Sequence, residues 1–377
     1  MTVLVLRALG LGDTLTGVAA LRGVRRAWPG HRVVLAAPAT LGQWLADLGV
    51  VDAVLPTQGL IRLPWPWAGP GGAQDAPGCL AVNLHGRGPE SHRILLATRP
   101  DALIAYDNSE VGHIGPDWDD AEHEVLRWCR LVRSVGGPCE PDDLRLGPPD
   151  PPGGRGSQEP GQAQSDGWAQ KGGRARMGGR ADVIVHPGAA ANARRWPASR
   201  WAAVVTALTE WGHSVTLTGS PAERGLCARV RLQAVTHGAG AVRDLSGELA
   251  VPALAEIVAT ARLLVSTDTG VAHLATAYGT PSVTLFGPTP PELWGPAIDR
   301  DRHLVIWHDE PGTPPRDPNA DRLDPALARV PAEDVVAACE SALMPLPATP
   351  RGTMTPSKPS HPTTRAEVSS PAPSWPV

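Results

Sequence analysis

The sequence lacks the features that mark several large classes of protein. Its 38 acidic residues outnumber 34 basic ones and the formal net charge is −4, so a nucleic-acid partner is not expected. No uninterrupted apolar run approaches the ~20 residues that span a bilayer, and no basic leader with a small-residue cleavage site follows Met1. The protein is therefore expected in the cytoplasm, and peripheral contact with the inner face of the membrane is compatible with this expectation.

Cysteine and lysine are also scarce. The five cysteines are scattered and no two form a CxxC pair (Cys79, Cys129, Cys139, Cys227 and Cys339). A disulfide framework or a zinc site is therefore not expected, and a reducing compartment fits best. Lys171 and Lys358 are the only lysines, so arginine is expected where other proteins use lysine.

The chain contains apolar strands that alternate repeatedly with helical patterns. Its 377 residues are enough for two domains. The predicted strands are 3–8, 32–37, 51–56, 79–85 and 102–106, then 182–188, 214–220, 262–268 and 282–287. Helical patterns follow 10–13 and Pro221, begin near 270, and cover 38–48, 122–135, 198–211 and 331–343. Buried strands that alternate with helices predict parallel sheets covered on both faces.

Two such Rossmann-like units facing each other across a cleft form the GT-B architecture, an α/β fold that binds ligands beyond the carboxyl ends of its strands. We expect an N-terminal domain at 1–146 and a C-terminal domain at 182–344. Residues 147–181 are rich in Pro, Gly, Gln and Ser and nearly lack aliphatic side chains. They cannot bury enough surface to offset the entropy of ordering, so a flexible linker is predicted there, and a disordered tail at 345–377 for the same reason.

Three strand-to-helix turns would place polar groups at the cleft, and the first is GLGD at 10–13. Gly10 and Gly12 allow a tight turn, and Asp13 opens the helix. Asp13 is either a plain N-cap or a general base that takes a proton from an acceptor hydroxyl. A dinucleotide fingerprint is excluded, because the GxGxxG spacing fails after Asp13.

The second turn is HPGAAANARRWP at 186–197, and the third opens STDTGVAHLATAYGTPSVTLFG at 266–287. Small residues, a helix N-terminus and Arg194 suit a diphosphate, while Arg195 is expected to point to solvent. In the third turn Asp268 would suit sugar hydroxyls, and Thr269 and Gly270 would suit phosphates. His273 is either a further ligand-binding group or a core histidine.

Together these motifs carry a resemblance. Four segments resemble glycosyltransferase family 9, the ADP-heptose:lipopolysaccharide heptosyltransferases: MTVLVLRALGLGDTLTGVAALRGVRRAWPGHRVVLAAP, HPGAAANARRWPASRWAAVV, TLTGSPAE and LVSTDTGVAHLATAYGTPSVTLFGPTPPELWGP. The resemblance covers nearly all of 1–344 except the linker. The resemblance implies an inverting, metal-independent bacterial enzyme of cell-envelope biogenesis, without a cofactor. It would move a sugar, heptose from an ADP-heptose-type donor, onto a glycan, glycolipid or small-molecule hydroxyl.

The resemblance also implies roles for single residues. Asp13 matches the catalytic base, and Arg194 stands where relatives most often have a lysine that binds phosphate. Glu223 matches the acidic residue that holds the donor ribose. The donor sugar and diphosphate contacts correspond to Gly12, Asp268, Thr269, Gly270 and His273. Ala189 and Ala190 depart from the family, because hydroxyl residues often bind phosphate at these positions.

Other interpretations remain at this point. A nucleotide-sugar epimerase on the same fold would need no acceptor, and a non-catalytic nucleotide-sugar-binding protein would need no base at position 13. An acidic metal motif at 299–301 is disfavoured, because it lies late, in a polar loop. In the first domain, acceptor contacts are considered for His85, Arg87, His92 and Arg93, with a solvated helix face as the alternative.

Overall fold

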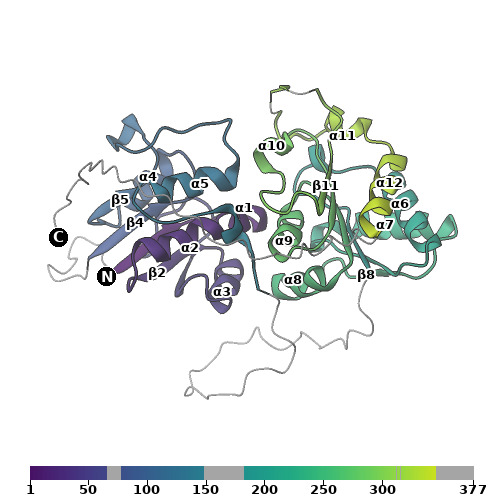
Figure 1. The fold of residues 1–377 in the computed structure, drawn as a ribbon, viewed down its shortest axis with the longest axis horizontal. Helices are drawn as coiled ribbons and strands as arrows, with labels where there is room; N and C mark the ends of the chain where they lie inside the picture. The colour runs from purple at the N-terminus through teal and green to yellow at the C-terminus, as the bar shows by residue number, and fades with distance from the viewer. Residues whose placement is uncertain (66–77, 148–181, 311, 315, 345–377) are drawn as a thin grey trace, which may run out of the picture. The chain divides into compact units, whose positions relative to one another are not determined.

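The computed structural model describes residues 1–65, 78–147, 182–310, 312–314 and 316–344. The predicted linker, from residue 148 onward, and the predicted tail lie outside these ranges. The described part folds into two α/β units, each built on a parallel sheet (Figure 1). The predicted fold class is therefore confirmed.

The first unit has a five-stranded sheet in the order β3-β2-β1-β4-β5, and all its pairs are parallel. Side chains that alternate along β1 enter two different cores, since Val3 and Val5 belong to one apolar cluster and Leu4 and Leu6 to another. This is the pattern of a strand covered on both faces. The strands are β1 (Thr2–Leu6), β2 (Arg32–Ala37), β3 (Ala53–Pro56), β4 (Cys79–Asn83) and β5 (Ala102–Ile104); the helices are α1 (Leu11–Thr16), α2 (Val18–Ala27), α3 (Ala39–Asp47), α4 (Glu90–Leu96) and α5 (Glu124–Arg133), with 3-10 turns η1 (Ser109–Val111) and η2 (Pro141–Leu144).

The second unit has a six-stranded parallel sheet in the order β11-β10-β9-β6-β7-β8. Its central strands β6 and β9 are buried along their length, apart from the half-buried His186 that ends β6. The strands are β6 (Val183–His186), β7 (Val215–Leu217), β8 (Val242–Asp244), β9 (Leu263–Thr267), β10 (Ser282–Leu285) and β11 (His303–Ile306); the helices are α6 (Ala198–Glu210), α7 (Arg224–Thr236), α8 (Val251–Thr260), α9 (Gly270–Tyr278), α10 (Pro291–Trp294), α11 (Pro325–Arg329) and α12 (Ala332–Leu343), with 3-10 turns η3 (Asn192–Arg194) and η4 (Pro221–Glu223).

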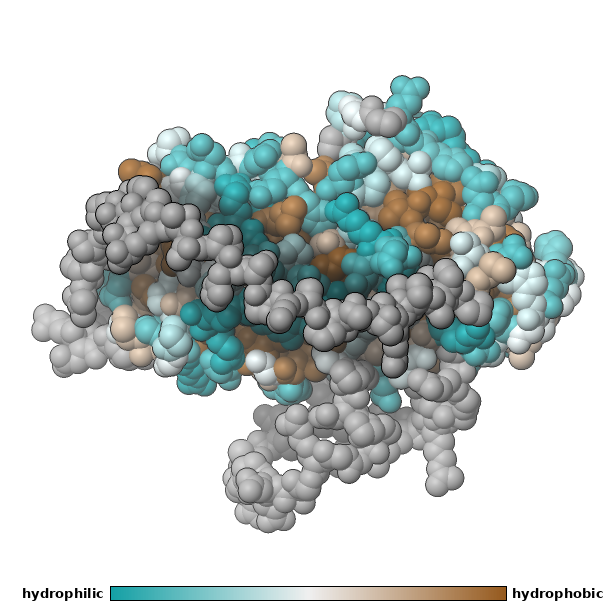
Figure 2. Space-filling model, viewed as in Figure 1, coloured by the Kyte–Doolittle hydropathy of each residue, from teal (hydrophilic) through white to brown (hydrophobic). Residues whose placement is uncertain are grey.

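The two units share an apolar core, because one cluster joins residues around α1, α2 and α5 to residues of α8 and α9. Helix α1 packs directly against α9 (Figure 1). Two polar contacts reinforce this junction: the Leu146 amide donates to the Ala277 carbonyl at 2.8 Å, and the Arg145 guanidinium binds both oxygens of Asp299. Seen from this side, the described surface is mainly hydrophilic with scattered hydrophobic patches (Figure 2). None of the described helices combines the length and apolarity needed to cross a membrane.

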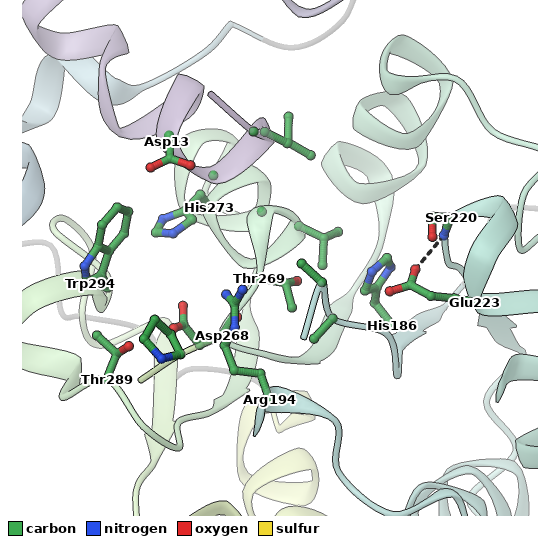
Figure 3. A pocket seen from close by; sticks show the side chains of 18 of the residues that line it. Asp13, His186, Arg194, Ser220, Glu223, Asp268, Thr269, His273, Thr289 and Trp294 are labelled. Atoms are coloured by element: carbon green, nitrogen blue, oxygen red, sulfur yellow. Dashed lines mark hydrogen bonds between the residues drawn. The ribbon is translucent and has the colours of Figure 1, made fainter. Parts of the chain in front are cut away.

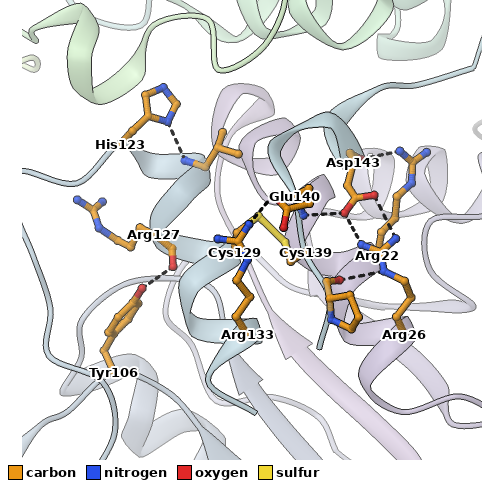
Figure 4. Close-up of a disulfide and its surroundings, with 12 residues drawn as sticks. Arg22, Arg26, Tyr106, His123, Arg127, Cys129, Arg133, Cys139, Glu140 and Asp143 are labelled. Atoms are coloured by element: carbon orange, nitrogen blue, oxygen red, sulfur yellow. Dashed lines mark hydrogen bonds and ion pairs between the residues drawn. A yellow bond between two sulfur atoms is a disulfide. The ribbon is translucent and has the colours of Figure 1, made fainter. Parts of the chain in front are cut away.

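The expectation about cysteine pairing is wrong for two residues. Cys129 of α5 and Cys139, which follows the turn after that helix, form a disulfide across ten residues, with 5.2 Å between their Cα atoms (Figure 4). Both are buried and pack beneath α2, where a Cβ on Gly23 would lie only 2.9 Å from the Cβ of Cys139. The pairing arises because α5 and the following turn fold back together, which the spacing of cysteines along the sequence does not reveal.

Candidate functional site

A cavity of about 590 Å³ opens where the carboxyl ends of β1, β6 and β9 meet, and both units contribute to its walls (Figure 3). Every candidate residue assigned through the family resemblance lines it: Gly12, Asp13, Arg194, Glu223, Asp268, Thr269, Gly270 and His273. Residues that the sequence did not single out also line it, among them His186, Ser220, Thr289, Trp294 and Asn319. His186 and Trp294 lie inside the quoted HPG and ELWGP segments, and those segments are the only sequence signal for them.

Asp13 lies in the first turn of α1, and Gly10 is the N-cap of that helix. The plain N-cap interpretation of Asp13 is therefore wrong. No side chain of the described residues donates a hydrogen bond to its carboxylate, which faces the cavity. Burial raises the pKa of Asp13; Arg7 and Arg194 oppose that shift, and Glu124 adds to it.

Two glycines bring the two units into contact at the cavity. A Cβ on Gly270 would lie 2.8 Å from the Gly12 nitrogen, and a Cβ on Gly12 would lie 3.0 Å from Cδ2 of His273. Both distances are shorter than ordinary contacts, and the first is to a backbone atom. A side chain at position 270 would therefore force α1 and α9 apart, whereas one at position 12 would first displace the His273 ring. The close approach places Asp13 and the free amides at the N-terminus of α9 on one cavity.

Arg194 ends η3 and reaches the end of β9. Its Nη1 donates to the Asp268 carbonyl at 3.1 Å, while its buried Nε has no partner among the described residues. Part of the guanidinium is thus anchored and part is free to bind an anion in the cavity. The expectation for Arg195 is wrong, because its Nε donates to the Ala189 carbonyl and its Nη1 to Oδ1 of Asn192, both at 2.9 Å. Arg195 therefore forms hydrogen bonds within its own loop instead of pointing to solvent.

Three polar groups lie at the end of β9 and in α9. Burial raises the pKa of Asp268 to about 6, although Arg194 opposes the shift. Thr269 is the N-cap of α9, and its buried Oγ1 has no partner within the described ranges. Burial lowers the pKa of His273 to about 4, so its ring is neutral at physiological pH, and it packs edge-on against Trp294 with ring centroids 6.1 Å apart.

The far end of the cavity carries a buried carboxylate. Glu223 closes a capping box, in which its Oε2 accepts from the Ser220 amide at 2.6 Å. A Cβ on Gly188 would overlap this carboxylate, so glycine at that position makes room for it. Nearby, Nδ1 of His186 bonds Oγ1 of Thr218 at 2.9 Å, and burial lowers the pKa of His186.

The four first-domain positions considered for an acceptor do not form one surface. His92 is fully buried, and its Nε2 bonds the Tyr106 carbonyl at 2.9 Å, so it cannot reach a ligand. His85 is half-buried and its Nδ1 accepts from the Ala8 amide at 3.2 Å. Arg87 and Arg93 are exposed and lie near acidic side chains on the surface.

Of the two acidic residues at 299–301, Asp299 is engaged in an ion pair. Arg145 binds Asp299 through two hydrogen bonds and thereby lowers the pKa of the Asp299 carboxyl. Over the ranges that the structure describes, no cluster of three or more His, Cys, Asp and Glu residues is arranged to hold a metal ion.

Comparison with known proteins gives consistent matches. The sequence model of glycosyltransferase family 9 (heptosyltransferase) matches residues 116–319. Lipopolysaccharide heptosyltransferase 3 of Escherichia coli is 29% identical over 163 residues, or 43% of this chain and 46% of the relative. Lipopolysaccharide heptosyltransferase 1 of Pseudomonas aeruginosa is 38% identical over 103 residues, 27% of each chain. The matches thus span less than half the length of these curated relatives.

Solved structures show the same fold over a greater length. The ADP-heptose lipopolysaccharide heptosyltransferase II of E. coli superposes with a TM-score of 0.65 at 18% identity, covering 91% of this chain and 98% of that one. The E. coli heptosyltransferase WaaC with ADP gives a TM-score of 0.60 at 18% identity, covering 91% and 100%. These likenesses confirm the predicted GT-B architecture.

Proposed function

The chain belongs to glycosyltransferase family 9, and from this membership and the cavity we propose that it transfers a sugar from a nucleotide-sugar donor to an acceptor hydroxyl. The proposed donor is an ADP-heptose-type compound, and the proposed acceptor is a glycan or glycolipid, in keeping with the names of its relatives. One observation carries the proposal: Asp13 from the first unit lines the same cavity as Arg194 and the N-terminus of α9 from the second unit.

The lining residues suggest how the donor lies. Glu223 offers a carboxylate for ribose hydroxyls at the far end of the cavity. The free part of the Arg194 guanidinium, the unpartnered Thr269 hydroxyl and the first amides of α9 suit a diphosphate. This order leaves the transferred sugar near Asp268, His273 and Asp13, where the acceptor would approach from the first unit.

In the proposed reaction, Asp13 takes the proton of the acceptor hydroxyl as the acceptor oxygen attacks the anomeric carbon. The bond from that carbon to the diphosphate oxygen breaks, and its electron pair leaves with the nucleoside diphosphate. A single in-line displacement of this kind inverts the anomeric configuration. General-base assistance is typically worth about 10²–10⁴-fold.

The leaving diphosphate gains negative charge as this bond breaks. Arg194 and the α9 N-terminus are positioned to stabilise that charge, and such electrostatic stabilisation is commonly the largest catalytic contribution. Because these groups supply the positive charge, we propose that the transfer needs no metal ion.

The test is a donor screen with ADP-, GDP-, UDP- and dTDP-sugars, with and without heptose-free lipopolysaccharide as acceptor, read by nucleoside diphosphate release and product analysis. We expect acceptor-dependent release from an ADP-sugar that persists in excess EDTA. Asp13→Asn should lower turnover at least ~100-fold while donor binding is retained, because the amide keeps the size but loses the basicity. Sugar conversion without acceptor would favour an epimerase, and EDTA inhibition reversed by Mg²⁺ would exclude the metal-free mechanism.

A further inference from the structure

A set of buried charged groups lies beneath the turn that carries Asp13. Arg7 follows β1 and is 1% exposed, and Glu124 and Arg127 of α5 are 5% and 7% exposed. Nη2 of Arg7 lies 3.1 Å from Oε1 of Glu124, and Nη1 of Arg127 lies 2.6 Å from Oε2 of the same carboxylate. One carboxylate thus pairs with two guanidinium groups.

Arg7 also fixes the turn itself. Its Nε donates to the Asp13 carbonyl, its Nη1 to the Leu84 carbonyl, and its Nη2 to Oγ1 of Thr16 at 2.8 Å. A Cβ on Gly17 would lie 2.6 Å from Cδ of Arg7, so glycine there leaves space for this side chain. All three guanidinium nitrogens are therefore engaged, and they join α1 to the end of β4 and to α5.

The charges of Arg7, Glu124 and Arg127 do not balance among themselves. Two arginines and one glutamate leave one positive charge, and an ionised Asp13 cancels it. An uncompensated charge in a buried site is unfavourable, so the set favours the carboxylate form of Asp13. This opposes the effect of burial, which favours the neutral carboxyl.

We propose that Arg7 and Glu124 are positioning residues that set the protonation state of Asp13 from beneath, with Arg7 favouring the ionised base and Glu124 limiting that preference. This inference rests on the proposed role of Asp13 as the base. The other titratable and charged groups around the turn are Arg194 and Asp268 of the second unit, the neutral His273 of α9, His123 at the start of α5, and His85 beside Arg7.

Two substitutions should move the pH profile in opposite directions. Arg7→Met removes a positive charge, so Asp13 should protonate at higher pH and the acidic limb of kcat/KM should move up. Glu124→Gln removes a negative charge and keeps the size, so that limb should move down. Each shift should be about one pH unit, the lower end of the effect of a nearby charge, which corresponds to about a tenfold change in rate on the limb.

Two further variants separate charge from packing. Arg7→Lys keeps the charge but cannot reproduce all the hydrogen bonds, so it should restore the position of the acidic limb without restoring full kcat. Arg25→Gln removes an arginine whose ion pair with Asp52, at 2.8 Å, lies on the exposed side of the same unit. It should leave the profile unchanged.

The inference is overturned if Arg7→Met and Glu124→Gln shift the limb in the same direction or not at all. If Arg7→Met does not fold, Glu124→Gln decides alone, and an unmoved limb then refutes the inference. NMR titration of the Asp13 carboxyl in ¹³C-aspartate-labelled protein, assigned by its loss in Asp13→Asn, provides the same test without turnover. An inactive wild-type chain would contradict the proposed function, while the titration would still decide the inference.

Discussion

Replacing Gly270 with alanine should slow transfer without unfolding the chain. The new Cβ would lie 2.8 Å from the Gly12 nitrogen and 2.9 Å from Cβ of Leu11. The nitrogen belongs to the backbone and cannot rotate away. Ordinary contact begins at 3.4 Å, so α1 and α9 would have to separate by about 0.6 Å. The amide of residue 270 remains, so any loss comes from spacing and not from a missing phosphate contact.

The size of the effect follows from this displacement. Overpacking of this kind costs ~1–3 kcal/mol, and an alanine in a helix regains up to ~1 kcal/mol over glycine. The net loss of stability should therefore be ~0–2 kcal/mol, which is too little to unfold a chain of ordinary stability. A misplacement of ~1 Å can cost ~10²-fold in rate, so a displacement near half that distance should lower kcat by about tenfold or more.

The assay is acceptor-dependent nucleotide release beside urea denaturation, for three alanine variants. Gly12→Ala should be milder, because its new Cβ meets Cδ2 of His273, a side-chain atom, at 3.0 Å, and the Gly270 Cα only at 3.3 Å. Gly225→Ala is the matched control, since it lies at the exposed start of α7 with its nearest atom 3.7 Å away. If Gly270→Ala turned over like Gly225→Ala, the close approach of the helices would not matter for the reaction.

The remaining predictions concern charge, pH and the disulfide. Arg194→Ala should lower both donor affinity and kcat, with a fall in kcat of ~10²-fold. Arg194→Lys should recover much of this loss, because a point charge suffices. Equal kcat in the wild type and both variants would place the phosphate-binding group elsewhere. Asp268→Asn should stabilise the fold by about 2–3 kcal/mol at pH 8, because the pKa of this carboxyl rises from 3.8 to about 6 on burial. The pKa of Asp268 is higher in the folded chain than in the unfolded chain, so its ionisation costs stability above pH 6, and this cost disappears as the pH falls toward 4. Urea denaturation should therefore give free energies of unfolding for the wild type and Asp268→Asn that converge at low pH. A difference that stays constant with pH would show that ionisation of Asp268 is not its cause. Reduction of the Cys129–Cys139 bond should lower the free energy of unfolding by about 3 kcal/mol, the chain-entropy value for a loop of this length, and an unchanged urea midpoint with dithiothreitol would show that the bond does not constrain the unfolded chain.

Both sheets and their helices follow from the sequence where the apolar pattern is long and regular. The runs at 32–37 and 262–268 predicted β2 and β9 to within a residue at each end, because strands buried on both faces need continuous apolar side chains. The helix expected after GLGD is interrupted at Gly17, where the Arg7 side chain occupies the space of a Cβ. Strands β8 and β11 were not predicted, because they are short and only partly buried.

Some residues of the candidate site could likewise be predicted from the sequence, and others could not. Turn chemistry is local, so GLGD and STDTG were enough to direct attention to Asp13, Asp268 and Thr269, and the structure brings all three to one cavity. The sequence could not show that Arg195 bonds its own loop or that His92 is buried, because both depend on which carbonyl lies nearby.

The tertiary structure alone decided the partners of the buried charges. Arg7 and Glu124 are 117 residues apart in the chain, and they meet only once α5 has packed against α2 in the folded unit. Cys129 and Cys139 meet for a similar reason, through a turn whose direction α2 fixes. The sequence determined the elements and the turns, since backbone preference and apolar periodicity act over a few residues. Charge pairing and cross-linking act through space, so they are settled only when the elements have packed.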